Sequence, residues 1–69
     1  MKRNVVSSST IASVGYDERR KLLEIEFTSG AVYRYADVSR EVHAGLMSAD
    51  SLGFFFNSYI KGKYRYSRQ

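Results

Sequence analysis

The sequence predicts an α+β fold, with a three- to four-stranded antiparallel sheet (a meander) and two short helices packed on one face. Residues 23–27 and 31–35 alternate apolar and polar side chains, which is typical of strands with one face in water. Residues 38–60 then carry apolar side chains at helical spacing. The chain has 69 residues, enough for one thin hydrophobic core. We therefore expect a single domain over residues 1–69.

The composition is that of a folded chain, with 43% hydrophobic and 14% aromatic residues. Because cysteine is absent, disulfides and thiolate-bound metals cannot stabilise the fold, and aromatic packing has to supply that stability. No apolar run is long enough to span a bilayer, and no signal-peptide stretch follows Lys2 and Arg3. We therefore expect a cytoplasmic domain with no membrane partner.

The first predicted strand covers residues 9–16, which are mostly small or β-branched. Residues 1–8 are mostly polar and show no periodicity, so we expect them to fray. The charged residues 17–21 suit a solvated turn before the next strand.

The second and third predicted strands form a hairpin around Thr28-Ser29-Gly30. A three-residue loop with Gly30 in a left-handed conformation pairs Ile25 with Tyr33 on one face and Glu24 with Arg34 on the other. A two-residue loop would mix apolar and polar faces, so we expect the three-residue loop. The face that carries Glu24 is expected to be open to water.

Both predicted helices have a serine near their start. Ser39 suits the cap of the first helix, whose apolar stripe includes Val38, Val42 and Leu46. Asp50 or Ser51 suits the cap of the second helix, and Gly62 is placed to end it. The apolar side of the second helix comprises Leu52, Phe55, Phe56, Tyr59 and Ile60.

The C-terminal residues concentrate positive charge. The formal net charge is +4, and residues 61–69 hold four cations and no acid, so this end carries the whole excess. Tyr64 and Tyr66 alternate with the cations, which allows a short fourth strand with the tyrosines inward and the cations outward. The segment can equally hang free, and we expect residues 66–69 to fray.

An ordered set of short motifs from about Val6 to Tyr64 resembles the KTSC domain family. The motifs are Ser8-Ser9-x-Ile11, Val14-Gly15-Tyr16-Asp17, Leu23-x-Ile25-x-Phe27-x-x-Gly30-x-x-Tyr33-x-Tyr35-x-x-Val38, Ala49-x-Ser51-x-Gly53, and Phe55-Phe56-Asn57 followed by Ile60-Lys61 and Tyr64. That family consists of short domains that stand alone or end some lysyl-tRNA synthetases. The resemblance implies an accessory role, with nucleic-acid binding the usual supposition and no catalytic residues to carry over.

The candidate nucleic-acid-binding residues lie in the C-terminal segment, where cations can neutralise phosphates and aromatic rings can stack on unpaired bases. They are Lys61, Lys63, Tyr64, Arg65, Tyr66 and Arg68. The expected partner is tRNA or single-stranded RNA, with RNA favoured over DNA. The alternative is that the tyrosines only pack and the cations form a solvated rim.

Arg19, Arg20 and Lys21 form a second basic cluster in the turn between the first two predicted strands. Asp17 and Glu18 offset two of these charges, so a solvated turn is the simpler interpretation. The cluster can also extend a path for phosphates.

No residues suggest catalysis, a metal site or a cofactor. His43 is the single histidine and has no partner nucleophile or set of metal ligands in its pattern. Glu24 and Glu26 share a strand face, but general acid–base catalysis needs a shielded carboxyl group. We expect a protein that is not an enzyme.

The alternative function is protein–protein interaction or self-association through the aromatic second helix and the sheet edge. A helix cannot turn Phe54, Phe55 and Phe56 toward one core, so we expect Phe54 to be partly exposed. The expected state is a monomer or a weak homodimer, and a protein partner is possible.

Overall fold

The computed structural model describes residues 1–69 and has five strands. They form one antiparallel sheet in the order β1-β2-β3-β4-β5, so each strand pairs with the next along the chain. Their bounds are Arg3–Val5 for β1, Ile11–Asp17 for β2, Leu22–Phe27 for β3, Val32–Tyr35 for β4 and Tyr66–Arg68 for β5. The predicted meander is confirmed.

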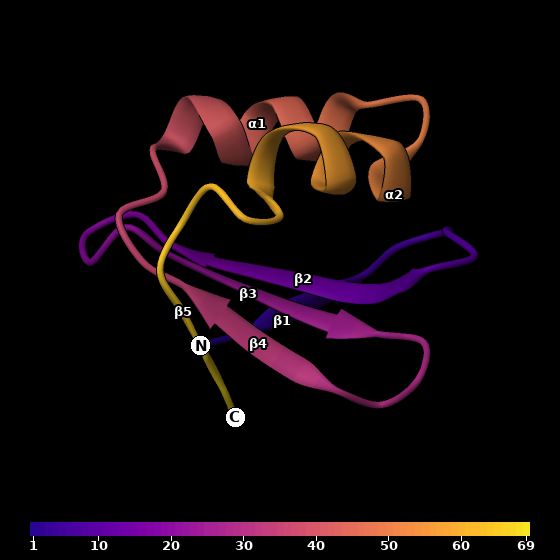
Figure 1. Ribbon diagram of the computed structural model, residues 1–69, viewed down its shortest axis with the longest axis horizontal. Coiled ribbons are helices and arrows are strands. Elements are labelled where there is room, and N and C mark those ends of the chain that lie inside the picture. The colour runs from indigo at the N-terminus through magenta and orange to yellow at the C-terminus, as the bar shows by residue number, and fades with distance from the viewer.

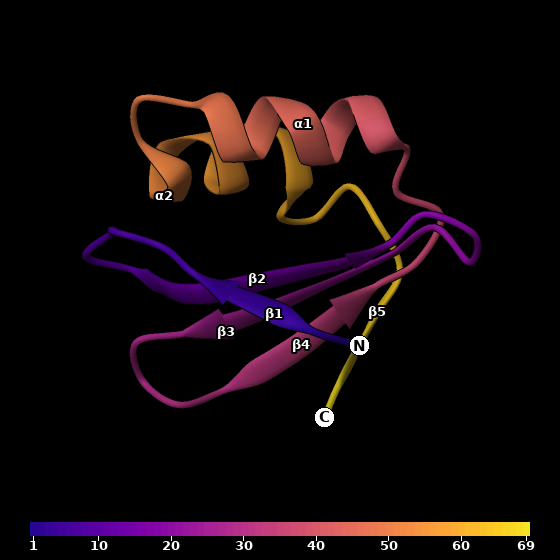
Figure 2. The ribbon, with the colours of Figure 1, turned by 180° about the vertical axis from the view of Figure 1, so that it is seen from behind.

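Two helical segments lie between β4 and β5 in the sequence and cover one face of the sheet (Figures 1 and 2). Helix α1 spans Arg40–Ser48, and α2 spans Leu52–Phe55 and continues into a π-helical turn, η1, over Phe56–Ile60. The predicted α+β class and the two helices on one face are confirmed. Neither helix has the length and apolar character needed to cross a lipid bilayer.

The prediction of three to four strands is wrong, because both chain ends add a strand. Residues within 1–8 and 66–69, where we expected fraying, pair as β1 with β2 and as β5 with β4. These three-residue strands are bound by backbone hydrogen bonds at the sheet edges. Such pairing needs no apolar alternation, and Val5 is 88% exposed, so the sequence pattern gives little sign of β1.

The predicted hairpin register is confirmed. Ile25 pairs with Tyr33, and Glu24 pairs with Arg34. Gly30 has φ of +97°, the Phe27 N–H donates to the Ala31 carbonyl, and the Gly30 N–H donates back to the Phe27 carbonyl.

The helix caps also follow the prediction. Ser39 Oγ accepts a hydrogen bond from the Val42 N–H, and Ser51 Oγ accepts one from the Phe54 N–H at 3.1 Å. The second helix ends at Ile60 with Lys61 as its C-cap, and Gly62 follows with φ of +76°.

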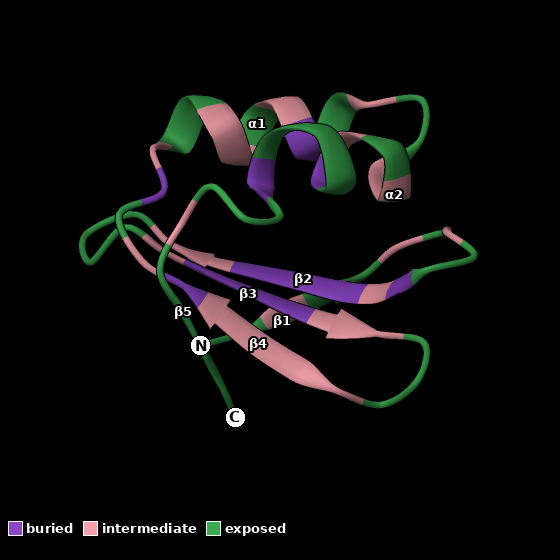
Figure 3. Ribbon diagram, in the orientation of Figure 1, coloured by how far each residue is buried: buried purple, intermediate pink, exposed green.

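The hydrophobic core lies between the helices and the sheet (Figure 3). Its buried members are Ile11, Val14, Leu23, Ile25, Tyr35, Val38, Leu46, Phe56 and Ile60. Phe54 is 70% exposed, as expected for one of three successive phenylalanines. Tyr59 is 59% exposed, so its placement on the apolar side of the helix is wrong. The wider π turn changes the side-chain spacing and keeps Phe56 and Ile60 inside instead.

The expectation that the sheet face at Glu24 is open to water is wrong, because the Glu24 side chain is buried. The residue is 5% exposed and is held between Arg3 Nη1 at 2.6 Å and Arg34 Nη2 at 2.8 Å. Burial raises the pKa of the Glu24 carboxyl, but hydrogen bonds from Arg34 and Arg3 outweigh burial and hold that pKa below its ordinary value. Arg3 comes from β1, the strand that the sequence pattern did not predict.

Candidate nucleic-acid interface

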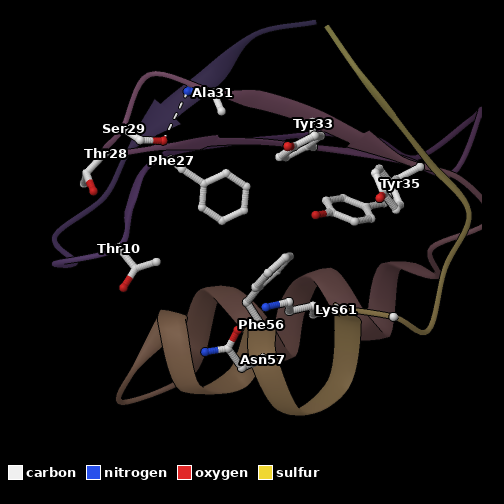
Figure 4. A pocket seen from close by; sticks show the side chains of 12 residues that line it. Thr10, Phe27, Thr28, Ser29, Ala31, Tyr33, Tyr35, Phe56, Asn57 and Lys61 are labelled. Carbon is white, nitrogen blue, oxygen red and sulfur yellow. Dashed lines mark hydrogen bonds between the residues drawn. The ribbon is translucent and has the colours of Figure 1, made fainter.

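A groove runs between the inner face of β3 and β4 and the turn η1, with a volume of about 660 Å³ (Figure 4). Figure 4 shows Phe27 on the sheet side and Phe56 on the helix side with their rings toward each other, and Tyr33 and Tyr35 also on the sheet side. Aromatic rings dominate the lining, and they belong to Phe27, Tyr33, Tyr35, Phe56 and Tyr66. None of the residues that line the groove is acidic. The sequence pattern does not predict this groove, although it places Tyr33 and Tyr35 on the face that carries Phe27.

The aromatic rings meet edge to face, an arrangement that stabilises such pairs. Phe27 and Phe56 have ring centroids 5.2 Å apart, and Tyr33 and Tyr66 have centroids 5.5 Å apart. Tyr66 is nevertheless 60% exposed, because β5 lies at the sheet edge. Its ring therefore offers free surface at one side of the groove.

Tyr35 places a hydroxyl group in the groove. Burial, together with the neighbouring Tyr33 and Tyr66, raises the pKa of Tyr35 to about 12. The hydroxyl thus stays protonated at neutral pH. The Tyr35 hydroxyl makes no hydrogen bond within the protein. Every fully buried side-chain nitrogen or oxygen does have a hydrogen-bond partner, so this hydroxyl is not fully buried and reaches solvent through the groove.

Asn57 and Lys61 supply the polar groups on the helix side of the groove (Figure 4). Asn57 directly follows Phe56, and Lys61 directly follows Ile60. The side chains of Phe56 and Ile60 point into the core. Asn57 and Lys61 therefore lie together on the flank of the helix. Asn57 is exposed, and its amide makes no hydrogen bond within the protein. It also borders a second, polar hollow lined by the loop at residues 7–10.

The predicted C-terminal cations occupy different positions. Lys61 lines the groove, and Lys63 is exposed in the connection to β5. Arg65 Nη2 lies 3.7 Å from Asp37 Oδ2, but both side chains are more than four-fifths exposed, so this pair is weak. Arg68 lies 5.9 Å from the Tyr33 ring centroid and pairs with Tyr33 in the strand register. Arg68 therefore lies on the same face of the sheet as Tyr33 and Tyr66.

The two predicted tyrosines separate as well. Tyr64 is half-buried against the core cluster, so packing accounts for its position. Tyr66 lines the groove. Of this pair, Tyr66 is the one whose ring is available to a ligand.

The second basic cluster, Arg19, Arg20 and Lys21, lies in the exposed turn between β2 and β3. Asp17 Oδ1 accepts hydrogen bonds from the N–H groups of Arg19 and Arg20, which fixes the turn. The Lys21 carbonyl accepts from the Val38 N–H, and the Arg65 carbonyl accepts from the Ala36 N–H. The turn and the residue that precedes β5 thus both lie beside residues 36–38, at one end of the sheet.

His43 has a packing role. Its ring stacks on Tyr16 at 4.6 Å and 12°, and Tyr16 donates its hydroxyl hydrogen bond to the Val38 carbonyl. Burial lowers the pKa of His43. The stack joins α1 to β2.

Known proteins resemble the chain in both sequence and structure. A family model described as the KTSC domain matches residues 7–64. A protein of Stutzerimonas stutzeri is 51% identical over 69 residues, with 99% of this chain and 97% of that protein covered. The crystal structure of a KTSC domain protein from Yersinia pestis has a TM-score of 0.97 at 43% identity, covering 99% of this chain and 96% of that one.

A lysine–tRNA ligase of Nostoc punctiforme contains a similar segment. It is 40% identical over 60 residues, which are 87% of this chain but only 11% of the ligase. A ligase of Trichormus variabilis matches in the same way, at 38% identity over 60 residues. The match to this chain covers only a small part of the length of each ligase.

Proposed function

The chain belongs to the KTSC domain family, and from this premise we propose that it is a non-catalytic accessory domain that binds nucleic acid, with RNA favoured over DNA. The proposed contact surface consists of the aromatic groove and the C-terminal segment, with Lys61, Lys63, Arg65 and Arg68 at phosphates. Arg19, Arg20 and Lys21 extend the path for phosphates at the end of the sheet.

The observation that carries this proposal is the groove itself, which combines aromatic rings with nearby cations and has no acidic lining. Phosphates are attracted to the cations, and the release of condensed counterions drives their binding. Bases have π faces that stack on aromatic rings, which requires that they be unpaired. RNA offers such bases in loops and single strands. The similarity to segments of lysine–tRNA ligases also favours RNA.

The test is a titration of labelled single-stranded RNA and tRNA at several salt concentrations. We expect the logarithm of the affinity to fall linearly with the logarithm of salt, by about 0.7 per phosphate contacted in a single strand. Lys63→Glu should weaken binding and flatten that slope. Lys2→Glu is the matched control, because Lys2 is also exposed but lies beside β1 at the opposite edge of the sheet.

Two results would count against this proposal, one against nucleic-acid binding and one against the proposed contact surface. One is the absence of binding even at low salt. The other is equal loss of affinity in Lys63→Glu and Lys2→Glu, since that pattern reports net charge and not a defined surface.

A second candidate function is protein interaction or self-association, and the exposed aromatic residues of the second helix favour it. Phe54 is 70% exposed and Tyr59 is 59% exposed, and the Tyr59 ring lies 4.8 Å from that of Phe55. Light scattering of the wild type and of Phe54→Ser distinguishes the two functions. A wild type that is dimeric and does not bind RNA, together with a monomeric Phe54→Ser variant, would favour protein interaction or self-association.

A further inference from the structure

We propose that the groove accommodates one unpaired base of the bound nucleic acid and that the Tyr35 hydroxyl forms a hydrogen bond to the edge of that base. The inference rests on the proposed nucleic-acid binding, and it names the residue that orients the ligand inside the groove. It concerns the recognition of an unpaired base, whichever of the four bases that is.

Tyr35 is a nearly buried residue whose hydroxyl group has no partner within the protein. The residue is only 5% exposed, and its ring packs against Phe56 with centroids 5.6 Å apart. Buried polar groups in proteins are normally hydrogen-bonded, because an unsatisfied group costs free energy. Tyr16 follows this rule, since its hydroxyl donates to the Val38 carbonyl. The Tyr35 hydroxyl instead opens into the groove, so a molecule inside the groove has to satisfy it.

The Tyr35 hydroxyl is a neutral donor at physiological pH. Burial, together with Tyr33 and Tyr66, raises the pKa of Tyr35 to about 12, so the proton stays on the oxygen. A tyrosine hydroxyl donates one hydrogen bond and can also accept one. Each of the four bases carries an acceptor on its Watson–Crick edge. That edge is engaged in a duplex and free in an unpaired base, so the hydroxyl can serve any base that is unpaired.

Tyr66 provides the stacking surface beside this hydroxyl group. Tyr35 and Tyr66 are paired in the register of β4 and β5, and their ring centroids are 5.8 Å apart. Both rings line the groove, and Tyr66 is 60% exposed. A base that stacks on the groove side of Tyr66 therefore lies next to the Tyr35 ring. The volume of about 660 Å³ falls within the range of about 300–1,000 Å³ that is typical of small-ligand pockets.

Lys61 supplies the charge that a nucleotide needs in the same groove. It is the one charged residue of the lining, and Figure 4 shows its side chain extending along the groove beside Phe56. The groove thus combines aromatic rings, a neutral hydroxyl donor and one ammonium group. A nucleotide matches all three, because it joins a planar base with an acceptor edge to a phosphate.

The experiment measures affinities of the wild type and Tyr35→Phe for a single-stranded RNA and for a duplex of the same sequence and length. Tyr35→Phe removes only the hydroxyl group and should weaken binding of the single strand by about three- to tenfold, as expected for one hydrogen bond. The affinity for the duplex should stay unchanged. The salt slope should also stay unchanged, because no phosphate contact is removed.

Tyr16→Phe is the matched control, because it removes a hydroxyl group that does not line the groove. It should lower stability in urea and leave the affinity for the single strand unchanged. Tyr35→Phe should do the reverse, since its hydroxyl makes no hydrogen bond within the protein. In the wild type, the ring-proton signals of Tyr35 and Tyr66 should shift during titration with the single strand.

The failures of the two proposals can be told apart. An affinity for the single strand that Tyr35→Phe does not change, or an equal loss for single strand and duplex, would overturn the contact to the base and leave nucleic-acid binding standing. Ring-proton signals of Tyr35 and Tyr66 that do not move at saturation would overturn it too, without the need for any variant. No binding to either RNA or to tRNA at low salt would refute both proposals.

Discussion

Arg3, Gly15, Glu24 and Arg34 lie in one row across the outer face of the sheet, because each is paired with the next in the strand register. Gly15 has no side chain, so Arg3 passes over it and reaches Glu24 on β3. The Glu24–Arg34 pair is predictable from the hairpin loop alone. The contact from Arg3 is not, because β1 has no apolar alternation that reveals it.

We expect Gly15→Ala to destabilise the protein. A Cβ at Gly15 would lie 2.8 Å from the Lys2 carbonyl oxygen and 3.0 Å from Arg3 Cγ, so β1 has to shift. Overpacking of this kind costs about 1–3 kcal/mol, which urea denaturation can measure. Unchanged stability, with β1 amides still protected from hydrogen exchange, would contradict this account of the row.

The Glu24 carboxyl should make stability depend on pH. Its pKa in the folded protein lies below the ordinary value of 4.5, so the unfolded chain binds more protons in acid. The contribution is thus fully present above the ordinary pKa and is lost as pH falls through the folded pKa. Urea denaturation between pH 7 and pH 3 should show that the stability difference between the wild type and Glu24→Gln shrinks in acid. A difference that stays constant over this range would refute the argument.

Among the elements, the helix caps and the hairpin are the parts that the sequence predicts best. Ser39, Ser51 and Gly30 act on backbone groups within a few residues of themselves, so their signals are local. The π turn is different, because it depends on whether Phe56 and Ile60 can both reach the core. Pattern reasoning that assumes α-helical spacing therefore places Tyr59 inside, where the structure does not have it.

Ser51→Ala tests the cap of the second helix. Ser51 Oγ accepts from the Phe54 N–H, and loss of such a cap costs about 1 kcal/mol in the free energy of unfolding. The control is Ser58→Ala, since Ser58 lies on the exposed side of the same helix. Equal stability changes in the two variants would show that Ser51 does not act as a cap.

In the whole molecule, the aromatic groove is assembled from the β3–β4 hairpin on one side and η1 and β5 on the other, two parts of the chain that are far apart in the sequence. Its existence depends on how the helices sit over the sheet, and no local pattern reports that. The charge distribution is easier to predict, because all four C-terminal cations lie in one segment. Only the structure brings Lys61 to the groove, sets Arg68 beside the Tyr33 ring and pairs Arg65 with Asp37.

The central claim, that this domain binds RNA along the groove and its C-terminal segment, is tested most directly by amide chemical-shift mapping during titration with single-stranded RNA. We predict salt-sensitive shifts over residues 57–68 and along β4. Shifts confined to α1 and the exposed side of α2, or no shifts at low salt, would contradict the claim.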